Sequence, residues 1–165
     1  MNGLFKVGDV VIYGAQGICK IDSVETKQIG KQSAKYYVLK PIFNLNTAVF
    51  VPAHNEQLAA KMQNVLTKPQ AEELIKKIAL IDNVKSKDEG HKREQYKEIL
   101  SSGNRERLVS LIKTIRLERD VRRQNGKKLN INDEQTLRKA ELLFYNELAF
   151  VYGVAPDEVK NIIEF

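Results

Sequence analysis

The chain has 165 residues, of which 42% are hydrophobic and 29% charged, and its formal net charge is +6. This composition is typical of a globular protein with one domain or two small ones. No run approaches the roughly twenty apolar residues of a membrane span and the first six residues do not resemble a signal peptide, so we expect no membrane association.

The first third of the chain predicts short β-strands joined by turns. In "VGDVVIYG" and "ICKIDSVE" β-branched residues are frequent, the second run alternates imperfectly as a kinked strand does, and Gly14 and Gly17 supply turn backbone. "QIGKQSAK" predicts a loop around Gly30, and "YYVLK" and "TAVFVP" predict two more strands. About four or five short strands, nearly without helix, favour a small Tudor- or SH3-like β-barrel over residues 1–66.

From Thr67 onward the period of the apolar residues becomes helical. Thr67 and Gln70 have the spacing of a capping box, and Pro69 suits a first helical turn. "AEELIKKIALI" continues at helical spacing, and after the polar stretch "DNVKSKDEGH" a second helix, "KREQYKEIL", runs to Gly103.

The later helices are marked by apolar stripes. One stripe consists of Leu108, Leu111, Ile112 and Ile115, and the other of Leu137, Ala140, Phe144, Leu148 and Val151. Gly126 is a natural helix stop, Asn132 is the expected cap of the next helix, and Pro156 begins a last short helix with Val159, Ile162 and Ile163. We therefore expect an α+β protein with an all-α domain of about five helices over residues 67–165.

The positive charge is concentrated in one segment. Residues 85–128 hold 14 Lys and Arg against 7 Asp and Glu, whereas residues 129–165 hold 3 against 7. A phosphate-binding surface needs such a concentration, and a solvated helix face with mixed charges is the open alternative.

Residues that could carry catalysis are few. His54, His91 and the single cysteine, Cys19, make no recognisable metal set, and Glu25 stands where a P-loop ending at "GKQS" would need glycine. One cysteine also excludes an internal disulfide framework and suits a reducing compartment, and its apolar surroundings favour a buried structural thiol. We expect no enzyme, no cofactor, no metal and no small-molecule substrate.

Several basic residues are candidates for phosphate contact. On an ideal helix Arg105, Lys113, Arg116 and Arg123 fall within about a quarter-turn, beside the apolar stripe, and Arg119, Arg122, Lys127 and Lys128 extend the positive end. Upstream, Lys92, Arg93 and Lys97 bracket Tyr96, which could stack a base or belong to the core. The helix dipole is a purely structural reason for Arg122 and Arg123.

The chain resembles the CarD/CdnL family of bacterial transcription regulators. The resemblance lies in "LFKVGDVVIYGAQGICKI", "YYVLKP", "VFVPA" with Asn55 after it, "QYKEILSSGN" and "LRKAELLFYNELA", in the family's order. The first of these segments is also similar to the polymerase-binding module of transcription-repair coupling factors, whose helicase motifs the chain lacks.

The resemblance implies a Tudor-like domain that docks on the β-subunit lobe of RNA polymerase and a helical domain that touches promoter DNA at the upstream edge of the bubble. Such proteins stabilise the open complex and are not enzymes. We expect a cytoplasmic monomer at the nucleoid that contacts DNA largely independently of sequence. The expected polymerase contacts are Lys27, Val49, Phe50, Val51 and Pro52, on an exposed edge strand. Some members carry arginine in place of Phe50, so an apolar contact is favoured there.

On the DNA side the chain departs from the family. Many members have a tryptophan before the "YKEIL"-like helix, whereas this chain has none and the corresponding position is near Glu89. A basic pair before the position of Leu137 is replaced by Glu134 and Gln135. The basic residues expected near DNA on these two segments are His91, Lys92, Arg93, Lys97, Arg138 and Lys139.

Two other functions stay open. "VGDVVIYGAQGICKI" also resembles a KOW-type barrel, which would indicate an RNA- or ribosome-binding protein but leaves the helical half unexplained. The third hypothesis is a protein-only adaptor whose basic face serves solubility.

Overall fold

The computed structural model describes residues 5–44, 46–86 and 88–165. The chain divides into two compact units, Met1–Val65 and Leu66–Phe165, and each is described by itself. No helix of the described part is both long and apolar enough to cross a membrane.

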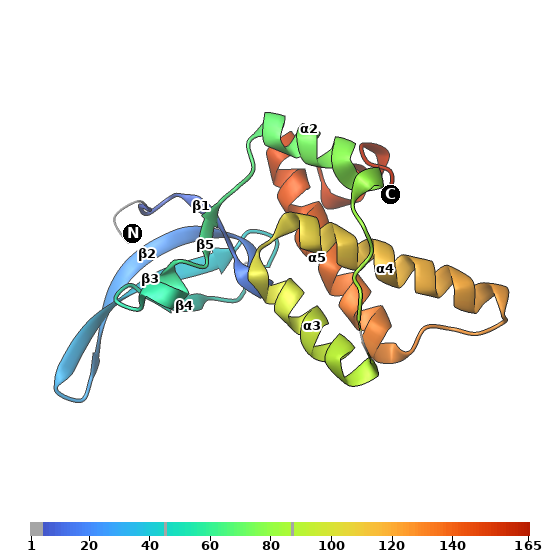
Figure 1. Ribbon diagram of the computed structural model, residues 1–165. Coiled ribbons are helices and arrows are strands. Elements are labelled where there is room, and N and C mark those ends of the chain that lie inside the picture. Colours follow the sequence, from blue (N-terminus) through green and yellow to red (C-terminus); the bar gives the residue numbers. More distant parts are fainter. Residues whose placement is uncertain (1–4, 45, 87) are drawn as a thin grey trace. The chain divides into compact units, whose positions relative to one another are not determined.

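The first unit is an antiparallel sheet in the order β4-β3-β2-β1-β5 (Figure 1). Its strands are β1 Val10–Tyr13, β2 Gly17–Ile29, β3 Gln32–Pro41, β4 Val49–Pro52 and β5 Met62–Asn64, with the short 3₁₀ helix η1 (Gly14–Gln16) and helix α1 (Glu56–Ala59) between them. The α+β class is confirmed, but among the described strands the sheet is open and not a closed barrel. The short β4 and β5 form its two edges and do not pair with each other.

Strands β2 and β3 form a ribbon that is longer than the sequence predicts. "QIGKQSAK" is not a loop, because the strands continue to Ile29 and from Gln32 and are joined by a tight turn at Gly30, whose φ of +65° suits glycine. The kink expected in β2 is confirmed by a register shift between Ile21 and Ser23. The outer part of the ribbon is largely exposed, so no apolar alternation marked it as strand.

One face of the sheet carries the core of this unit. Cross-strand pairs such as Val11 with Cys19 and Tyr37 with Val51 point to this face together. The core cluster contains Val11, Cys19, Ile21, Tyr37, Leu39, Val51, Ala59 and Met62. Cys19 is fully buried, as expected, and burial raises the pKa of its thiol to about 12.

The second unit is helical. It consists of α2 Lys68–Lys77, η2 Ile78–Leu80, α3 Glu89–Ser102, α4 Arg105–Gln124, α5 Ile131–Tyr152 and η3 Pro156–Asn161. The expected capping box is present, since Thr67 Oγ1 accepts from Gln70 N while Gln70 Oε1 accepts from Thr67 N. Gly103 ends α3 in the left-handed conformation.

The expected cap of α5 is wrong by two residues. Asn130, not Asn132, is the N-cap, and its side-chain oxygen accepts the N–H of Asp133 at 2.8 Å. Asn132 lies inside the first turn. The expectation was wrong because "NIN" contains two asparagines that can each cap a helix. Only the periodicity of the apolar residues distinguished them, and periodicity defines helix ends poorly.

The two apolar stripes form the core of the helical unit. Leu108, Leu111, Ile112 and Ile115 of α4 are buried against Leu137, Ala140, Phe144 and Leu148 of α5. Val151 is half-buried at the rim of this cluster, Val159 and Ile163 belong to it, and Ile162 is exposed. Residues of α2, η2 and α3 also join the cluster, among them Ala71, Leu74, Ile78, Tyr96 and Ile99.

Candidate functional site

Strand β4 lies at the edge of the sheet. Its residues pair with β3 from Leu39 opposite Val49 to Tyr36 opposite Pro52, and no described strand lies on its other side. An edge of this kind presents backbone N–H and C=O groups that a strand of another protein can pair with.

The side chains of β4 differ in what they can offer. Phe50 is 42% exposed, and Val49 and Pro52 are half-buried. Val51 is fully buried in the core cluster. The side chain of Val51 therefore cannot reach a partner, and only its backbone lies at the edge.

Two of the residues expected to contact polymerase meet on the sheet. The Lys27 ammonium lies 3.5 Å from the centroid of the Phe50 ring. Lys27 pairs with Ala34 and Phe50 with Val38, and these two β3 residues are four apart, so the side chains project from the same face. A cation over an aromatic ring is attractive, and here both groups are open to solvent.

A groove of about 600 Å³ lies beyond the end of β4. Its lining is Gln32, Ser33, Ala34, Lys35, Tyr36, Ala53 and His54. The rings of Tyr36 and His54 pack edge to face with their centroids 6.5 Å apart, so His54 has a structural contact. Sequence reasoning missed this groove because it assigned most of the segment to a loop.

The basic row expected on α4 is mostly engaged inside the helical unit. Arg105 donates from Nε and Nη2 to both oxygens of Glu147, at 2.8 and 2.7 Å, and Glu147 also accepts the N–H of Leu66. Lys113 Nζ donates to the carbonyls of Ile78 and Ile81, at 2.8 and 2.6 Å, and so closes the end of η2.

Arg116 is likewise turned toward α5. Its Nε lies 3.0 Å from Glu141 Oε1, its Nη2 donates to Tyr145 Oη at 2.6 Å, and its guanidinium sits 4.4 Å from the ring centroid of Phe165. Burial alone would lower the pKa of Arg116, but Tyr145 and Glu141 outweigh it and raise the pKa. These contacts give Arg105, Lys113 and Arg116 structural roles.

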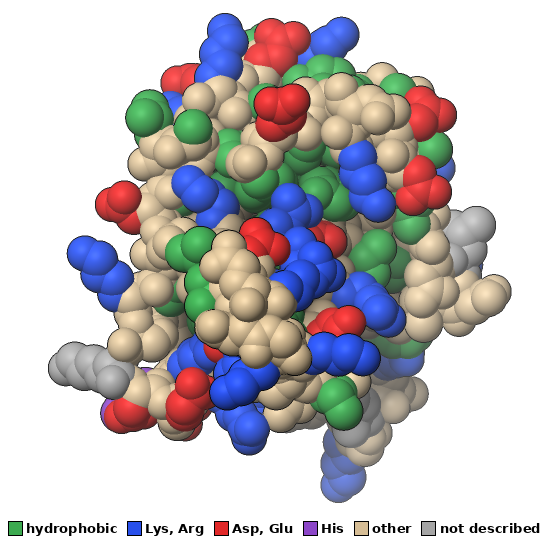
Figure 2. Space-filling model, turned by 90° about the vertical axis from the view of Figure 1, so that its right-hand side faces the viewer, with side chains coloured by type: hydrophobic (Ala, Val, Ile, Leu, Met, Phe, Trp, Pro, Cys, Tyr) green, Lys and Arg blue, Asp and Glu red, His purple; other side chains and the backbone are tan. Residues whose placement is uncertain are grey.

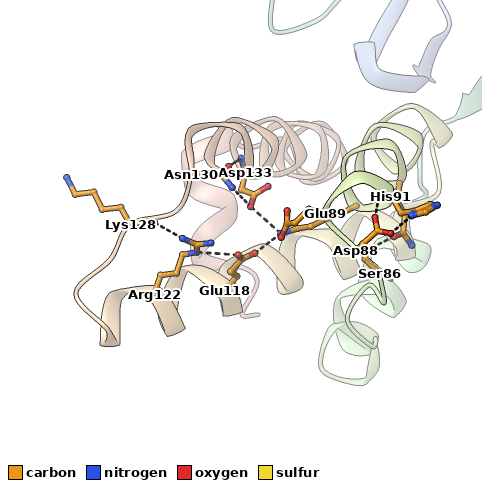
Figure 3. Close-up of polar contacts among 11 residues, drawn as sticks. Ser86, Asp88, Glu89, His91, Glu118, Arg122, Lys128, Asn130 and Asp133 are labelled. Atoms are coloured by element: carbon orange, nitrogen blue, oxygen red, sulfur yellow. Dashed lines mark hydrogen bonds and ion pairs between the residues drawn. The ribbon is translucent and has the colours of Figure 1, made fainter.

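Lys92 forms ion pairs with Glu89, Glu118 and Asp133, which Figure 3 labels, and so joins a polar network among α3, α4 and α5. Its Nζ is 3.1 Å from Glu118 Oε2 and 3.3 Å from Asp133 Oδ2, and its side chain is only 13% exposed. Arg122 donates to Glu118 at 3.3 Å and to the Lys128 carbonyl at 3.4 Å. Burial would lower the pKa of Lys92, but the hydrogen bond and charge of Glu118 and the charge of Asp133 raise it. The ammonium group of Lys92 therefore has a structural role within the helical unit.

At the start of α3, His91 is held by the cap of the helix. Asp88 Oδ1 accepts the N–H of His91 at 2.9 Å, and Asp88 Oδ2 lies 2.8 Å from His91 Nδ1 (Figure 3). The hydrogen bonds from His91 lower the pKa of Asp88. The side chain of His91 is exposed, but its Nδ1 is already paired with the Asp88 carboxylate.

The remaining predicted DNA contacts are exposed and have no side-chain hydrogen bond or ion pair within the described ranges. They are Arg93 and Lys97 on α3, Arg123 on α4, Lys127 and Lys128 in the α4–α5 turn, and Arg138 and Lys139 on α5. Figure 2 shows the side on which that turn lies, with many Lys and Arg side chains gathered near its centre. These cations could hold phosphates without breaking an internal contact.

Some of these cations line a second groove, between α3 and α5, of about 400 Å³. Its lining is Arg93, Tyr96, Lys97, Leu100, Asn132, Asp133, Gln135, Thr136 and Lys139. Tyr96 is only 4% exposed, so its ring belongs to the core more than to a stacking surface. The polar residues of α5 in this lining were missed, because only the packing of two helices reveals that they face α3.

The described residues contain no group of three or more His, Cys, Asp or Glu that could hold a metal ion. The arrangement instead offers two kinds of binding surface. One is a strand edge marked by a cation on an aromatic ring, and the other is a set of exposed cations on helices.

Residues 5–66 match a family model described as the CarD-like/TRCF RID domain. The matched residues cover the sheet described above, from before β1 to the end of β5. The N-terminal unit is therefore similar to this domain, and the match supports a CarD-like protein that interacts with RNA polymerase and is similar in this domain to transcription-repair coupling factors.

Proposed function

We propose that this protein regulates bacterial transcription by binding the β-subunit lobe of RNA polymerase and promoter DNA at the upstream edge of the bubble, and so stabilises the open complex. It acts by binding and not by catalysis, as a monomer without a cofactor, in the cytoplasm at the nucleoid.

The observation that carries the proposal is the Lys27–Phe50 contact beside the free edge of β4, in a domain of the CarD-like/TRCF RID family. The β4 backbone would pair with a strand of the lobe, which gives affinity through main-chain hydrogen bonds. The exposed Phe50 ring with Lys27 above it, and Pro52 on the same face of the strand, would give the apolar and charged parts of the contact, whereas Val49 packs on the core cluster of the opposite face.

The DNA part of the proposal rests on the exposed cations Arg93, Lys97, Arg123, Lys127, Lys128, Arg138 and Lys139. Phosphates would be their partners, so binding would be largely independent of sequence and steeply dependent on salt. Lys92, Arg105, Lys113 and Arg116 are left out of this contact set, because their donors are used within the helical unit.

The test is reconstitution with purified bacterial RNA polymerase. The protein should co-elute with core polymerase and with the isolated β lobe, and it should lengthen the lifetime of open complexes on a promoter. Co-purification with ribosomes and not with polymerase would instead favour a KOW-type function. Polymerase binding without any DNA contact at low salt would favour an adaptor.

A further inference from the structure

Helices α3 and α5 run side by side in the same direction (Figure 1), and Lys92 and Asp133 join them near their N-terminal ends. The groove between them has one row of lining residues from each helix. Arg93, Lys97 and Leu100 follow one another along α3, and Asn132, Thr136 and Lys139 follow one another along α5. Both rows have the spacing of one helix face.

The walls of this groove are positively charged on both sides. Arg93 and Lys97 stand one turn apart on α3, at a Cβ spacing of about 5–6 Å, and Lys139 stands on α5. All three are exposed and have no ion pair in the part of the chain that the structure describes. The one carboxylate in the lining, Asp133, is already bound by Lys92 and Asn130. The groove thus has a surplus of positive charge.

Between the charged walls the groove is polar. Asn132 and Gln135, which carry side-chain amides, are among the lining residues, and Thr136 carries a hydroxyl that donates to the Asn132 carbonyl at 2.9 Å. Leu100 and the nearly buried Tyr96 make up the apolar part. Amides both donate and accept hydrogen bonds. Nucleobase edges carry both donors and acceptors, whereas the carboxylates of an acidic peptide only accept, so amides suit nucleobases better.

We propose that this groove holds a single strand of DNA, with phosphates on Arg93, Lys97 and Lys139 and base edges at Asn132 and Gln135. A volume of about 400 Å³ admits a nucleotide but not a duplex, which could touch only the charged walls. In a duplex the Watson–Crick edges are paired and only the groove edges remain, so all edges of a base are open to such amides only in a single strand. The inference rests on the proposed contact with DNA and specifies which form of DNA the groove takes.

The test compares one fluorescent oligonucleotide as a single strand, as a blunt duplex, and as a single strand with abasic sites, using the full chain at several salt concentrations. The double variant Arg93→Gln/Lys139→Gln removes charge from both walls. Gln135→Met removes an amide at nearly constant side-chain length. Lys160→Gln is the matched control, because Lys160 is an exposed lysine on η3 outside the groove.

The double variant should bind the single strand about tenfold more weakly, with a log–log salt slope smaller by about 0.7 for each phosphate that the groove no longer holds. Its affinity for the duplex should change less than twofold. Gln135→Met should weaken binding of the intact strand severalfold and leave the abasic strand unaffected. Lys160→Gln should bind all three probes as the wild type does.

Equal losses of affinity for single strand and duplex would overturn the proposal, because the walls would then hold phosphates of either form. Unchanged binding by the double variant would remove the groove from the DNA surface while the proposed function stands. If the wild type bound neither DNA at low salt, the DNA part of the proposed function would fail as well. Displacement of the strand by polyglutamate at equal charge would assign the groove to an acidic protein partner.

Discussion

The Lys27 ammonium lies 3.5 Å from the centroid of the Phe50 ring, across a sheet in which β3 separates their strands. This contact holds a flexible lysine in place over an exposed ring beside the free edge of β4. A partner that docks there meets a preformed surface, which lowers the entropy that ordering these side chains would cost on binding.

Replacement of this ring by a carboxylate should disrupt docking. Phe50→Asp places a charge where an apolar contact is expected, and desolvation of that charge costs several kcal/mol, so affinity for polymerase should fall at least tenfold. Because Phe50 is 42% exposed, the melting temperature should stay close to the wild-type value.

The matched control is Val7→Asp, since Val7 is 58% exposed and precedes β1, which β2 and β3 separate from β4. Binding to the isolated β lobe, measured by interferometry, should separate the two variants. If a folded Phe50→Asp protein binds as tightly as the wild type, Phe50 is not in the interface.

Two arginines on α4 should behave in opposite ways. Arg123→Ala removes an exposed cation and should lower the log–log salt slope of duplex binding by about 0.9 while leaving stability nearly unchanged. Arg116→Ala breaks contacts with Glu141 and Tyr145 and should destabilise the protein by about 1.5–3 kcal/mol with no change in slope. Salt titrations and urea unfolding measure both quantities. A reduced slope for Arg116→Ala would show that this guanidinium leaves α5 to reach phosphate.

The buried pair of Arg105 and Glu147 should matter for stability. Glu147 is 4% exposed, and Glu147→Ala leaves a mostly buried guanidinium without its carboxylate, at a cost of about 3–5 kcal/mol. The exposed Glu158 gives the control Glu158→Ala, which should shift the urea midpoint little. Similar midpoints for the two variants would show that this ion pair contributes no net stability.

Stability should fall in alkaline solution because of Cys19. The folded-state pKa of this thiol is about 12, so the unfolded chain, whose thiol has a pKa near 9.0, loses its proton first as pH rises. The free energy of unfolding should therefore fall by about 1.4 kcal/mol more in the wild type than in Cys19→Ala between pH 8 and pH 10. Urea unfolding at both pH values checks this difference. Parallel losses in the two proteins would mean that the thiol is not protected from deprotonation.

The tryptophan that is absent from this chain can be restored. Glu89 begins α3 and its side chain is 81% exposed, so Glu89→Trp should fold without burying the new ring and should lengthen the lifetime of open complexes. Glu89→Gln separates removal of charge from addition of the ring. Equal lifetimes for the two variants would indicate that this end of α3 does not reach the bubble.

The helical half was the more predictable part of the fold. Leu108, Ile112 and Ile115 are fixed by local periodicity, and the same residues are buried in the structure. The β2–β3 ribbon was only half predicted, because its outer part is polar and exposed and carries no alternation. Backbone hydrogen bonds pair these two strands, and the pattern of side chains in the sequence reveals little of such pairing.

The candidate sites show the same limit. The helical wheel placed Arg105, Lys113 and Arg116 correctly along one side of α4, but it could not show that carboxylates of α5 and carbonyls of η2 lie there. Those partners lie at least 25 positions away in sequence. Likewise, Lys27 and Phe50 were each expected at an interface, but their contact follows only from strand register.

Leu66 belongs to the helical unit, because its N–H donates to Glu147 and its side chain packs on the helical core. A boundary drawn at the end of the family match, which includes residue 66, would put this residue in the wrong fragment. An isolated helical fragment for spectroscopy should therefore begin at Leu66 or earlier. A cut after Leu66 would remove the hydrogen bond from the Leu66 N–H to Glu147, the carboxylate that also binds Arg105. The fragment would then melt at a lower temperature because of where it was cut, not because of the residues that it contains.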